Sequence, residues 1–340
     1  MVRHGSLAFA LLALSTVHCA KRVPVAREEH TPAVVQCGDT LPMRVHFYNV
    51  GQGLAALVEL PTGQLLLVDS GESPTRPGCG NACRGWHEHF MNRLSADVGS
   101  KTIDLHWVTH PHSDHMGGSK AVLETHKVRS YADNGSLRRN AGVKRLLETA
   151  AEYGVPVLVA ARDTPQSRLA TNAALQVRGV MPNNWSVDCE KKPNDCSSGL
   201  RIDYCESSVL FVGDAEREEE SLLSVEQVDL LQVGHHGSNT SSSEEFLAKA
   251  RPQWAVISSG ERGEGTNAGY CHPRATTVQA LSATLGDTAG SPVEAFSGAS
   301  CKSGTDSEWQ QVPASTRLFV TARDGDVTFI TTGDGAFRRE

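Results

Sequence analysis

The chain has its densest group of metal-chelating side chains at residues 109–118, which read Thr109-His110-Pro111-His112-Ser113-Asp114-His115-Met116-Gly117-Gly118. An apolar, strand-like run at 103–109 leads into this stretch, and helical spacing follows it at 118–126. We therefore expect the chelating residues in the turn between a buried strand and a helix. The two glycines at its end let the backbone pass close to a site.

Within this turn the side chains can converge on two points. Because Pro111 favours an extended backbone at His110, the rings of His110 and His112 can face the same way. Asp114 and His115 follow the turn and can face a second point nearby. Three imidazoles and a carboxylate suit Zn²⁺, or Mn²⁺ where more oxygen ligands join. The alternative is a histidine-rich polar loop without metal, which four chelating residues at this spacing disfavour.

This HxHxDH pattern resembles that of the metallo-β-lactamase superfamily, and further motifs narrow the resemblance to the ComEC-type hydrolase domain of competence proteins. In the family's order these motifs are Val50-Gly51-Gln52-Gly53, Leu67-Val68-Asp69-Ser70-Gly71, Phe211-Val212-Gly213-Asp214-Ala215-Glu216, Gly234-His235-His236-Gly237-Ser238 with Thr240-Ser241, and Asn267 with Tyr270-Cys271-His272-Pro273. The resemblance implies an αββα sandwich, in which helices flank two mixed sheets.

The pattern of apolar runs agrees with an α/β fold, because strands first follow one another and later alternate with helices. The expected strands are 43–49, 55–60, 65–69, 103–109, 157–160, 173–180, 200–205, 208–212, 230–233, 254–258, 318–321 and 327–331, and the expected helices are 86–98, 118–126, 136–153, 243–249 and 275–285. We expect one hydrolase domain at 42–335 with cysteine-bearing loop insertions, after a polar segment at 21–41.

The resemblance also implies two divalent metal ions, Zn²⁺ or alternatively Mn²⁺. The implied ligands are His110, His112 and His235 for one ion, Asp114, His115 and His272 for the other, and Asp214 as the bridge. Two ions together can lower the pKa of a bridging water and stabilise the charge that develops on the attacked group. Asp114, Asp214 and His236 are the residues expected to take part in catalysis.

Some of these assignments have competing interpretations. Asp214 follows a glycine at the end of a strand, where an aspartate is often only a turn former or helix cap. His235 and His236 are neighbours that would face opposite ways in an extended chain. We expect His235 to bind metal and His236 to face the substrate or support the ligands. Asp69 is expected to orient a metal-bound histidine by a hydrogen bond, and otherwise to be a simple strand-end turn.

The sequence departs from the family pattern at several positions. Leu54 follows VGQG where many members have an acidic or amide residue. Asn239 follows HHGS where many have a cation that would suit a phosphate, which weakens a nuclease interpretation. The superfamily's usual metal-binding histidine between the first cluster and the bridging aspartate is missing, since His126 alone lies in that interval. The ComEC-type branch resembles this chain in that respect.

The first twenty residues predict an exported protein. Arg3 and the apolar run 7–17 are typical of a signal peptide at 1–20. Cys19 lies where a bacterial lipoprotein carries its lipidated cysteine, although Thr16-Val17-His18 is a poor match, so lipid anchoring and free secretion are both open. No later run approaches 18 apolar residues, so no transmembrane segment is expected after the leader. The predicted location is secreted, periplasmic or associated with the outer membrane.

The remaining cysteines support an oxidising compartment. They are even in number and allow up to four disulfides: Cys37, Cys79, Cys83, Cys189, Cys196, Cys205, Cys271 and Cys301. Cys79 with Cys83 and Cys189 with Cys196 are expected local staples. A zinc ribbon is disfavoured because no CxxC pair occurs.

Together these features predict a secreted or envelope metal-dependent hydrolase that acts on phosphodiester bonds, with DNA as a candidate substrate. The formal net charge of −7 excludes a basic footprint over the whole surface, so DNA would bind by local contacts only. The alternatives are a lactonase, a β-lactamase-like enzyme or a phosphocholine esterase. A further alternative is a non-catalytic, metal-binding envelope protein.

Overall fold

The computed structural model describes residues 31–135, 141–160, 165, 168–303 and 306–340. The expected signal peptide with Cys19, residues 21–30 of the polar segment at 21–41 and the start of the helix expected at 136–153 lie outside the described residues. Pro32–Glu340 forms one structural unit.

The first sheet has eight strands and is mixed. In spatial order they are β16 (Arg338–Arg339), β15 (Val327–Thr331), β1 (Met43–Phe47), β2 (Ala55–Glu59), β3 (Leu65–Asp69), β4 (Ile103–Trp107), β5 (Tyr131–Asp133) and β6 (Val157–Val159). Strands β15, β1, β2 and β3 pair antiparallel, whereas β3 to β6 pair parallel. The parallel half therefore brings several carboxyl ends of strands to one edge.

The second sheet repeats this plan with six strands. They are β14 (Leu318–Val320), β11 (Trp254–Ile257), β10 (Leu230–Gln232), β9 (Ser207–Phe211), β8 (Gly199–Tyr204) and β7 (Leu175–Val180). Strands β7 to β9 pair antiparallel, and β9, β10, β11 and β14 pair parallel. A separate antiparallel ribbon consists of β12 (Gly290–Phe296) and β13 (Trp309–Ala314).

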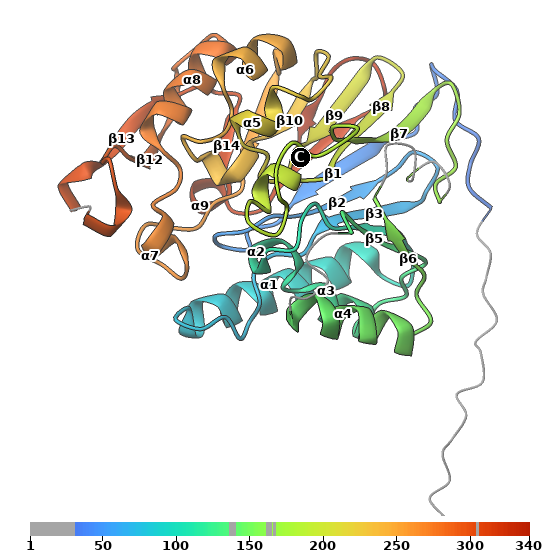
Figure 1. Ribbon diagram of the computed structural model, residues 1–340. Coiled ribbons are helices and arrows are strands. Elements are labelled where there is room, and N and C mark those ends of the chain that lie inside the picture. The colour runs from blue at the N-terminus through green and yellow to red at the C-terminus, as the bar shows by residue number, and fades with distance from the viewer. Residues whose placement is uncertain (1–30, 136–140, 161–164, 166–167, 304–305) are drawn as a thin grey trace, which may run out of the picture. The chain divides into compact units, whose positions relative to one another are not determined.

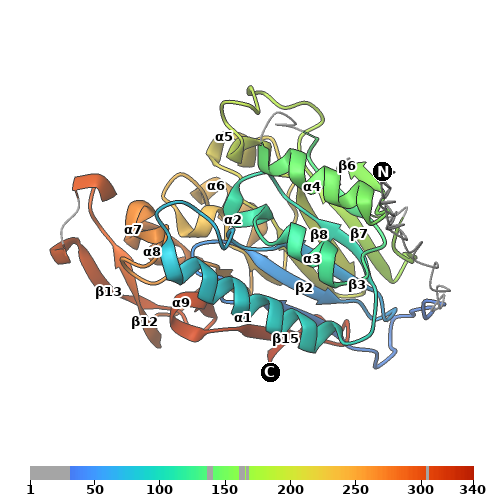
Figure 2. The same cartoon turned by 90° about the horizontal axis from the view of Figure 1, so that it is seen from below.

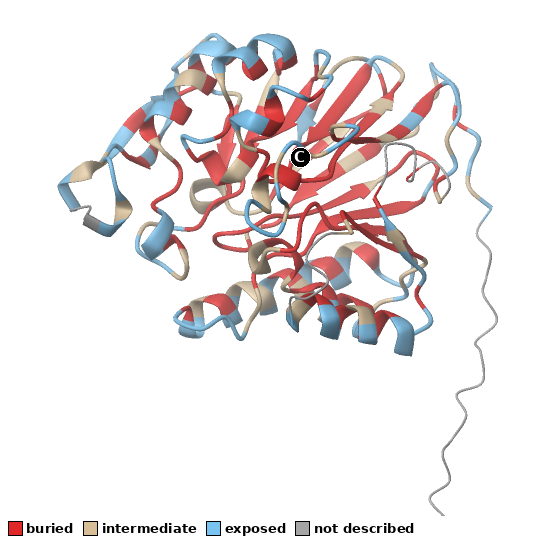
Figure 3. Ribbon diagram, viewed as in Figure 1, coloured by how far each residue is buried: buried red, intermediate tan, exposed pale blue. Residues whose placement is uncertain are grey.

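The two large sheets pack face to face because alternate side chains of their strands are apolar. In β1, Met43, Val45 and Phe47 belong to a core that also contains Leu200 and Ile202 of β8. The same core includes residues of β3, β4, β9 and β11. Figure 3 shows these strands as the most continuously buried part of the structure.

Helices cover the outer face of each sheet (Figures 1 and 2). The helices are α1 (Gly80–Val98), α2 (Ser113–Met116), α3 (Ser119–Thr125) and α4 (Ala141–Glu152) beside the first sheet, α5 (Arg217–Glu220), α6 (Glu244–Ala250) and α8 (Ala275–Leu285) beside the second, and the short α7 (Asn267–Tyr270) and α9 (Thr321–Asp324). Helix α1 buries Phe90, Leu94 and Val98, which its 3.6-residue period brings to one stripe, against Leu57 and Leu67. The predicted αββα sandwich is confirmed.

Several elements differ from the sequence-based expectation. Helix α1 begins at Gly80, before the expected 86, because its first turns carry small and polar residues without apolar spacing. The short strand β5 and the β12–β13 ribbon were not predicted. The segment expected to be polar contributes Val35 to the core between the sheets. The side-chain amide of Asn172 donates a hydrogen bond to the carbonyl oxygen of Val35.

The eight cysteines that were expected to form disulfides are joined in four pairs: Cys37–Cys205, Cys79–Cys83, Cys189–Cys196 and Cys271–Cys301. The two expected local staples are confirmed, and the pairing fits an extracytoplasmic, oxidising compartment. Among the described residues, no helix has the length and apolar character needed to cross a bilayer.

The Cys37–Cys205 disulfide should contribute most to stability, because its partners lie 168 residues apart in the chain. A cross-link that closes a long loop restricts the unfolded chain most, so Cys37→Ser with Cys205→Ser should lower the free energy of unfolding by about 3–5 kcal/mol. Urea unfolding of the oxidised protein measures this. The matched control is Cys79→Ser with Cys83→Ser, whose partners are 4 residues apart. Equal losses for the two pairs would contradict the loop-length argument.

Candidate metal centre

The site lies where loops that follow strands of both sheets meet, a common position for ligands in α/β folds. Asp69 ends β3, and the predicted metal-binding turn follows β4 and contains α2. On the other sheet, Asp214 follows β9 and the histidine pair follows β10 in a short 3₁₀ turn, η3 (Gly234–Gly237). Stretches far apart in the sequence are therefore joined only through the fold.

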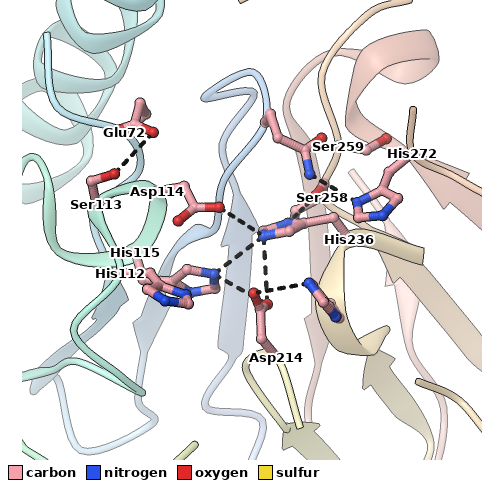
Figure 4. A network of polar contacts seen from close by, with 12 residues as sticks. Glu72, His112, Ser113, Asp114, His115, Asp214, His236, Ser258, Ser259 and His272 are labelled. Atoms are coloured by element: carbon pink, nitrogen blue, oxygen red, sulfur yellow. Dashed lines mark hydrogen bonds and ion pairs between the residues drawn. The ribbon is translucent and has the colours of Figure 1, made fainter. Parts of the chain in front are cut away.

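The structure assembles two groups of potential metal ligands that share Asp214. One group is Asp114, His115, Asp214 and His236, and the other is His110, His112 and Asp214. Within each group the ligand atoms lie within 4.8 Å of one another. Figure 4 shows Asp214 beneath His115 and His236, and Asp114 and Asp214 both contact Nε2 of His236 at 3.4 Å. A shared carboxylate is what two adjacent cations require.

The unsatisfied atoms of these groups fit metal binding. The Oδ1 of Asp214 is buried and accepts no hydrogen bond, although it lies 3.1 Å from Nε2 of His115. Nε2 of His115 and Nε2 of His236 face each other at 3.2 Å. Nε2 of His110 likewise lies 3.0 Å from Nδ1 of His112. Two neutral rings cannot satisfy facing lone pairs, whereas a divalent cation between them would.

Two histidines are held by their other nitrogen in the orientation that metal binding needs. Nδ1 of His115 donates to Oδ2 of Asp69 at 2.7 Å, and Asp69 also accepts hydrogen bonds from the backbone N–H and the hydroxyl of Thr109. Nδ1 of His236 donates to the carbonyl oxygen of Ser258 at 2.7 Å. Each ring therefore directs Nε2 into the ligand group. This is the geometry expected for the orienting role of Asp69.

Charge is concentrated at the centre. Burial disfavours charged His115, but the carboxylates of Asp214 and Asp69 raise the pKa of its ring well above the usual range. Against the same burial, Asp214 and Asp114 raise the pKa of His236 to about 10. Burial would raise the pKa of Asp214, yet His115 and His236 hold it well below its usual range. In the metal-free protein these rings carry protons that a metal ion must displace.

The structure places His235 outside both groups. Its Nδ1 lies 3.1 Å from Oε1 of Glu216, and its Nε2 lies 3.2 Å from Nδ2 of Asn194 and 3.9 Å from Oδ2 of Asp214. The backbone explains this reversal of the expected allocation. His235 and His236 both have left-handed φ values, 49° and 55°, so the rule for neighbours in an extended chain does not apply.

His272 also lies outside both groups. The side-chain amide of Gln52 donates to its Nδ1 at 3.1 Å, while Oε1 of Gln52 accepts from the backbone N–H of Gly260. Asn267 holds the backbone of His272 on both sides, by donating to its carbonyl oxygen and accepting from its N–H. Gln52, Asn267 and His272 thus form one hydrogen-bonded network, and His272 lines the cleft.

Glycine is required where the loops approach most closely. A Cβ at Gly117 would lie 2.0 Å from the backbone nitrogen of Ser73, and one at Gly53 would lie 2.6 Å from the carbonyl oxygen of Asp114. A side chain at Gly117 would displace the loop after β3, and one at Gly53 would move the loop between β1 and β2 away from the turn that contains Asp114.

The ligand groups open into a cleft of about 820 Å³. Its wall includes His112, Asp114 and Asp214 together with Tyr270 and His272. Three cationic side chains also line it, namely Arg76 after β3, Lys120 of α3 and Arg145 of α4. Sequence reasoning did not identify these cations, because nothing local distinguishes them from other surface lysines and arginines. It also missed Asn194, which lines the same cleft from a cysteine-bearing loop.

Residues 48–261 match the model of the Metallo-beta-lactamase superfamily. ComE operon protein 3 of Bacillus subtilis (strain 168) is 30% identical over 189 residues, covering 54% of this chain and 23% of that protein. Recombination protein 2 of Haemophilus influenzae is 28% identical over 226 residues, which cover 64% of this chain and 24% of that protein. A solved long form RNase Z from yeast is 11% identical, with a TM-score of 0.39, covering 67% of this chain and 38% of that chain.

The ligand groups and the family match together place this protein in the class of metal-dependent hydrolases. The chain belongs to the Metallo-beta-lactamase superfamily. The family inferred from the HxHxDH pattern is therefore confirmed, and the competence-protein relatives confirm the narrower resemblance. The chain spans about a quarter of the length of these relatives.

The histidine pair can be tested by substitution. His236→Ala should reduce metal content, because His236 lies within a ligand group and His235 lies outside both. His235→Ala should leave metal content closer to that of the parent protein. Losing a ligand typically costs more than the 10–100-fold in affinity that is lost with an outer-shell partner. Elemental analysis after dialysis against a weak chelator measures both variants. Greater metal loss from His235→Ala than from His236→Ala would restore the sequence-based assignment.

Proposed function

We propose that this protein is an extracytoplasmic two-metal hydrolase that cleaves phosphodiester bonds, with DNA as a candidate substrate. The observation that carries the proposal is the shared carboxylate of Asp214 at the base of a cleft lined by three cations. Neutral imidazole and carboxylate ligands together suit Zn²⁺ or Mn²⁺. When bound, two such ions supply an activated water and stabilise developing negative charge.

In this scheme His110 and His112 hold one ion, and Asp114, His115 and His236 hold the other, with Asp214 bridging. Asp69 positions His115 through the 2.7 Å hydrogen bond to Nδ1. Catalytic roles fall on Asp114 and Asp214, which hold the ions, and His236 contributes as a ligand.

His272 can position substrate as a hydrogen-bond donor. Because the amide of Gln52 donates to Nδ1, the ring proton of neutral His272 must reside on Nε2. Burial, together with the nearby charges of His235 and His236, holds the pKa of His272 well below its usual range, which keeps the ring neutral. Since His272 lines the cleft, its Nε2–H is suited to an anionic oxygen of the substrate.

The cations of the cleft support a phosphate-containing substrate. Arg76 donates to the hydroxyl of Ser113, next to the ligand Asp114, so its charge lies close to the metal groups. Lys120 and Arg145 extend the positive wall along two helices. The position after HHGS holds Asn239 where many family members have a cation. In this chain the positive charge of the cleft comes instead from Arg76, Lys120 and Arg145 on other elements. One relative of this chain is named Recombination protein 2, and recombination is a process that acts on DNA.

A second candidate is hydrolysis of a small ester, lactone, β-lactam or phosphocholine ester, and the net charge of −7 favours a substrate other than a long polyanion. Four disulfides support the proposed export, to the periplasm, the outer membrane or the medium, with Cys19 as a candidate lipid anchor. A non-catalytic envelope protein would bind metal but turn over none of these substrates.

The metal-dependent step is tested by Asp214→Asn, which keeps the size of the side chain but loses the charge between the ions. Hydrolysis should fall to near the uncatalysed rate, because metal activation lowers the pKa of water from about 15.7 to about 7. Metal-reconstituted mature protein should be assayed on DNA, bis-nitrophenyl phosphate, a lactone and a cephalosporin, with circular dichroism as the folding control. Normal turnover by Asp214→Asn would contradict the role proposed for its charge, since α5 is capped at Glu216 and not at Asp214.

The substrate class is tested by reversing charge on α4. Arg145→Glu should weaken DNA binding and reduce the dependence of log affinity on log salt by about one unit for the lost phosphate contact. Lys144→Glu is the matched control, since Lys144 is the adjacent residue of α4 and pairs with Glu148. If the two variants bind DNA with the same salt slope, the phosphodiester proposal loses its support and the small-ester candidate gains it.

A further inference from the structure

The two ligand groups are unequal. The group that contains His115 and His236 has four side chains, whereas the group of His110, His112 and Asp214 has three among the described histidines, cysteines and acids. Structural and catalytic Zn²⁺ sites have four ligands in all, and Mn²⁺ takes further oxygen ligands. A fourth side chain at this group would therefore have to be of another type.

Asn194 is held beside this group by a loop that the Cys189–Cys196 disulfide closes. It begins the 3₁₀ turn η2 (Asn194–Cys196), directly before β8. The backbone N–H of Ser198 donates to the carbonyl oxygen of Thr109 at 2.8 Å, and the hydroxyl of Ser197 accepts from the backbone N–H of Asp214 at 3.1 Å. The loop is therefore attached to both stretches that supply this ligand group.

Hydrogen bonding fixes the orientation of the Asn194 amide. The hydroxyl of Thr240 donates to Oε1 of Glu216 at 3.0 Å, and Nδ1 of His235 lies 3.1 Å from the same oxygen. Nδ2 of Asn194 donates to this same carboxylate oxygen at 3.5 Å, because a carboxylate oxygen can only accept. The same Nδ2 lies 3.2 Å from Nε2 of His235. The amide oxygen, Oδ1, consequently faces elsewhere.

That oxygen is buried and has no hydrogen-bond partner. Buried polar atoms are nearly always satisfied, so an unpaired one points to a missing partner such as an ion. The position of the amide is consistent with this. Nε2 of His235, which contacts the amide, lies 3.9 Å from Oδ2 of Asp214, and Nε2 of His110 lies 3.8 Å from the same Oδ2. Asn194 lines the same cleft as Asp214 and contacts the histidine that faces this oxygen of Asp214.

We propose that Oδ1 of Asn194 is the fourth protein ligand of the ion held by His110, His112 and Asp214. The inference rests on the two-metal function proposed above. In this chain Asn194 would take the place of the metal-binding histidine that the superfamily usually has between the first histidine cluster and the bridging aspartate. His235 is then a positioning residue that holds the amide through Nδ2. An amide oxygen is a harder ligand than imidazole, so this position should accept Mn²⁺ more readily than an all-nitrogen site would.

The experiment is metal titration of the mature, oxidised protein and its variants with Mn²⁺ and with Zn²⁺, read by elemental analysis and by electron paramagnetic resonance of Mn²⁺. Asn194→Ala should lose about one of the two ions, with at least a tenfold weaker affinity for that ion, because the amide is proposed as a direct ligand. Asn194→Asp, which keeps an oxygen ligand, should retain both ions. His110→Ala is the reference for loss of the same ion.

The outcomes separate this inference from the proposed function. If Asn194→Ala binds both ions as tightly as the parent while His110→Ala loses one, Asn194 is not a ligand and the two-metal proposal stands. If His110→Ala also keeps both ions, the two-metal proposal fails and this inference fails with it. Loss of one ion from Asn194→Ala but not from Asn194→Asp supports the assignment.

A second comparison tests the role of the loop. Cys189→Ser with Cys196→Ser should weaken binding of one ion, since the disulfide closes the loop that presents Asn194. The matched control is Cys79→Ser with Cys83→Ser, another disulfide of short sequence separation, at the start of α1, which carries no proposed ligand. Equal metal affinity in the two double variants would overturn the role assigned to the Cys189–Cys196 loop.

Discussion

The centre of this protein depends on one buried carboxylate. Asp214 is almost fully enclosed, and the rings of His110, His115 and His236 surround it. An enclosed charge is costly unless opposite charge accompanies it. The structure surrounds the carboxylate with rings whose pKa values it raises, and it arranges the same atoms as two potential ligand groups that share the carboxylate.

The rest of the fold serves to hold these groups in register. The parallel halves of both sheets end at the same edge, so their following loops converge there. Rigid partners behind the ligands, the carboxylate of Asp69 and the carbonyl oxygen of Ser258, fix the two rings that flank Asp214. The glycines at 53 and 117 allow the loops to approach, and the Cys189–Cys196 loop closes the remaining side. Preorganisation of this kind is what metal-dependent hydrolysis needs.

The sequence could predict those parts of the site that are local. His110, His112, Asp114 and His115 lie in one turn after one strand, so spacing and residue type were sufficient to indicate chelation. The histidine pair was harder, because the allocation depended on an extended backbone that η3 does not adopt. Asn194 left no signal in the sequence, since a single asparagine in a cysteine-bearing loop is usually only a turn residue.

By itself the sequence determined the layered α/β fold, the motif-bearing turns and the likeness to competence proteins, because apolar periodicity and ligand spacing act within a few residues. Only the tertiary structure decided which side chains form one potential ligand group. Asp214 meets His110 across 104 positions of chain, and His236 meets His115 across 121. Such pairings depend on how two sheets pack and how their loops turn, and no local pattern specifies either.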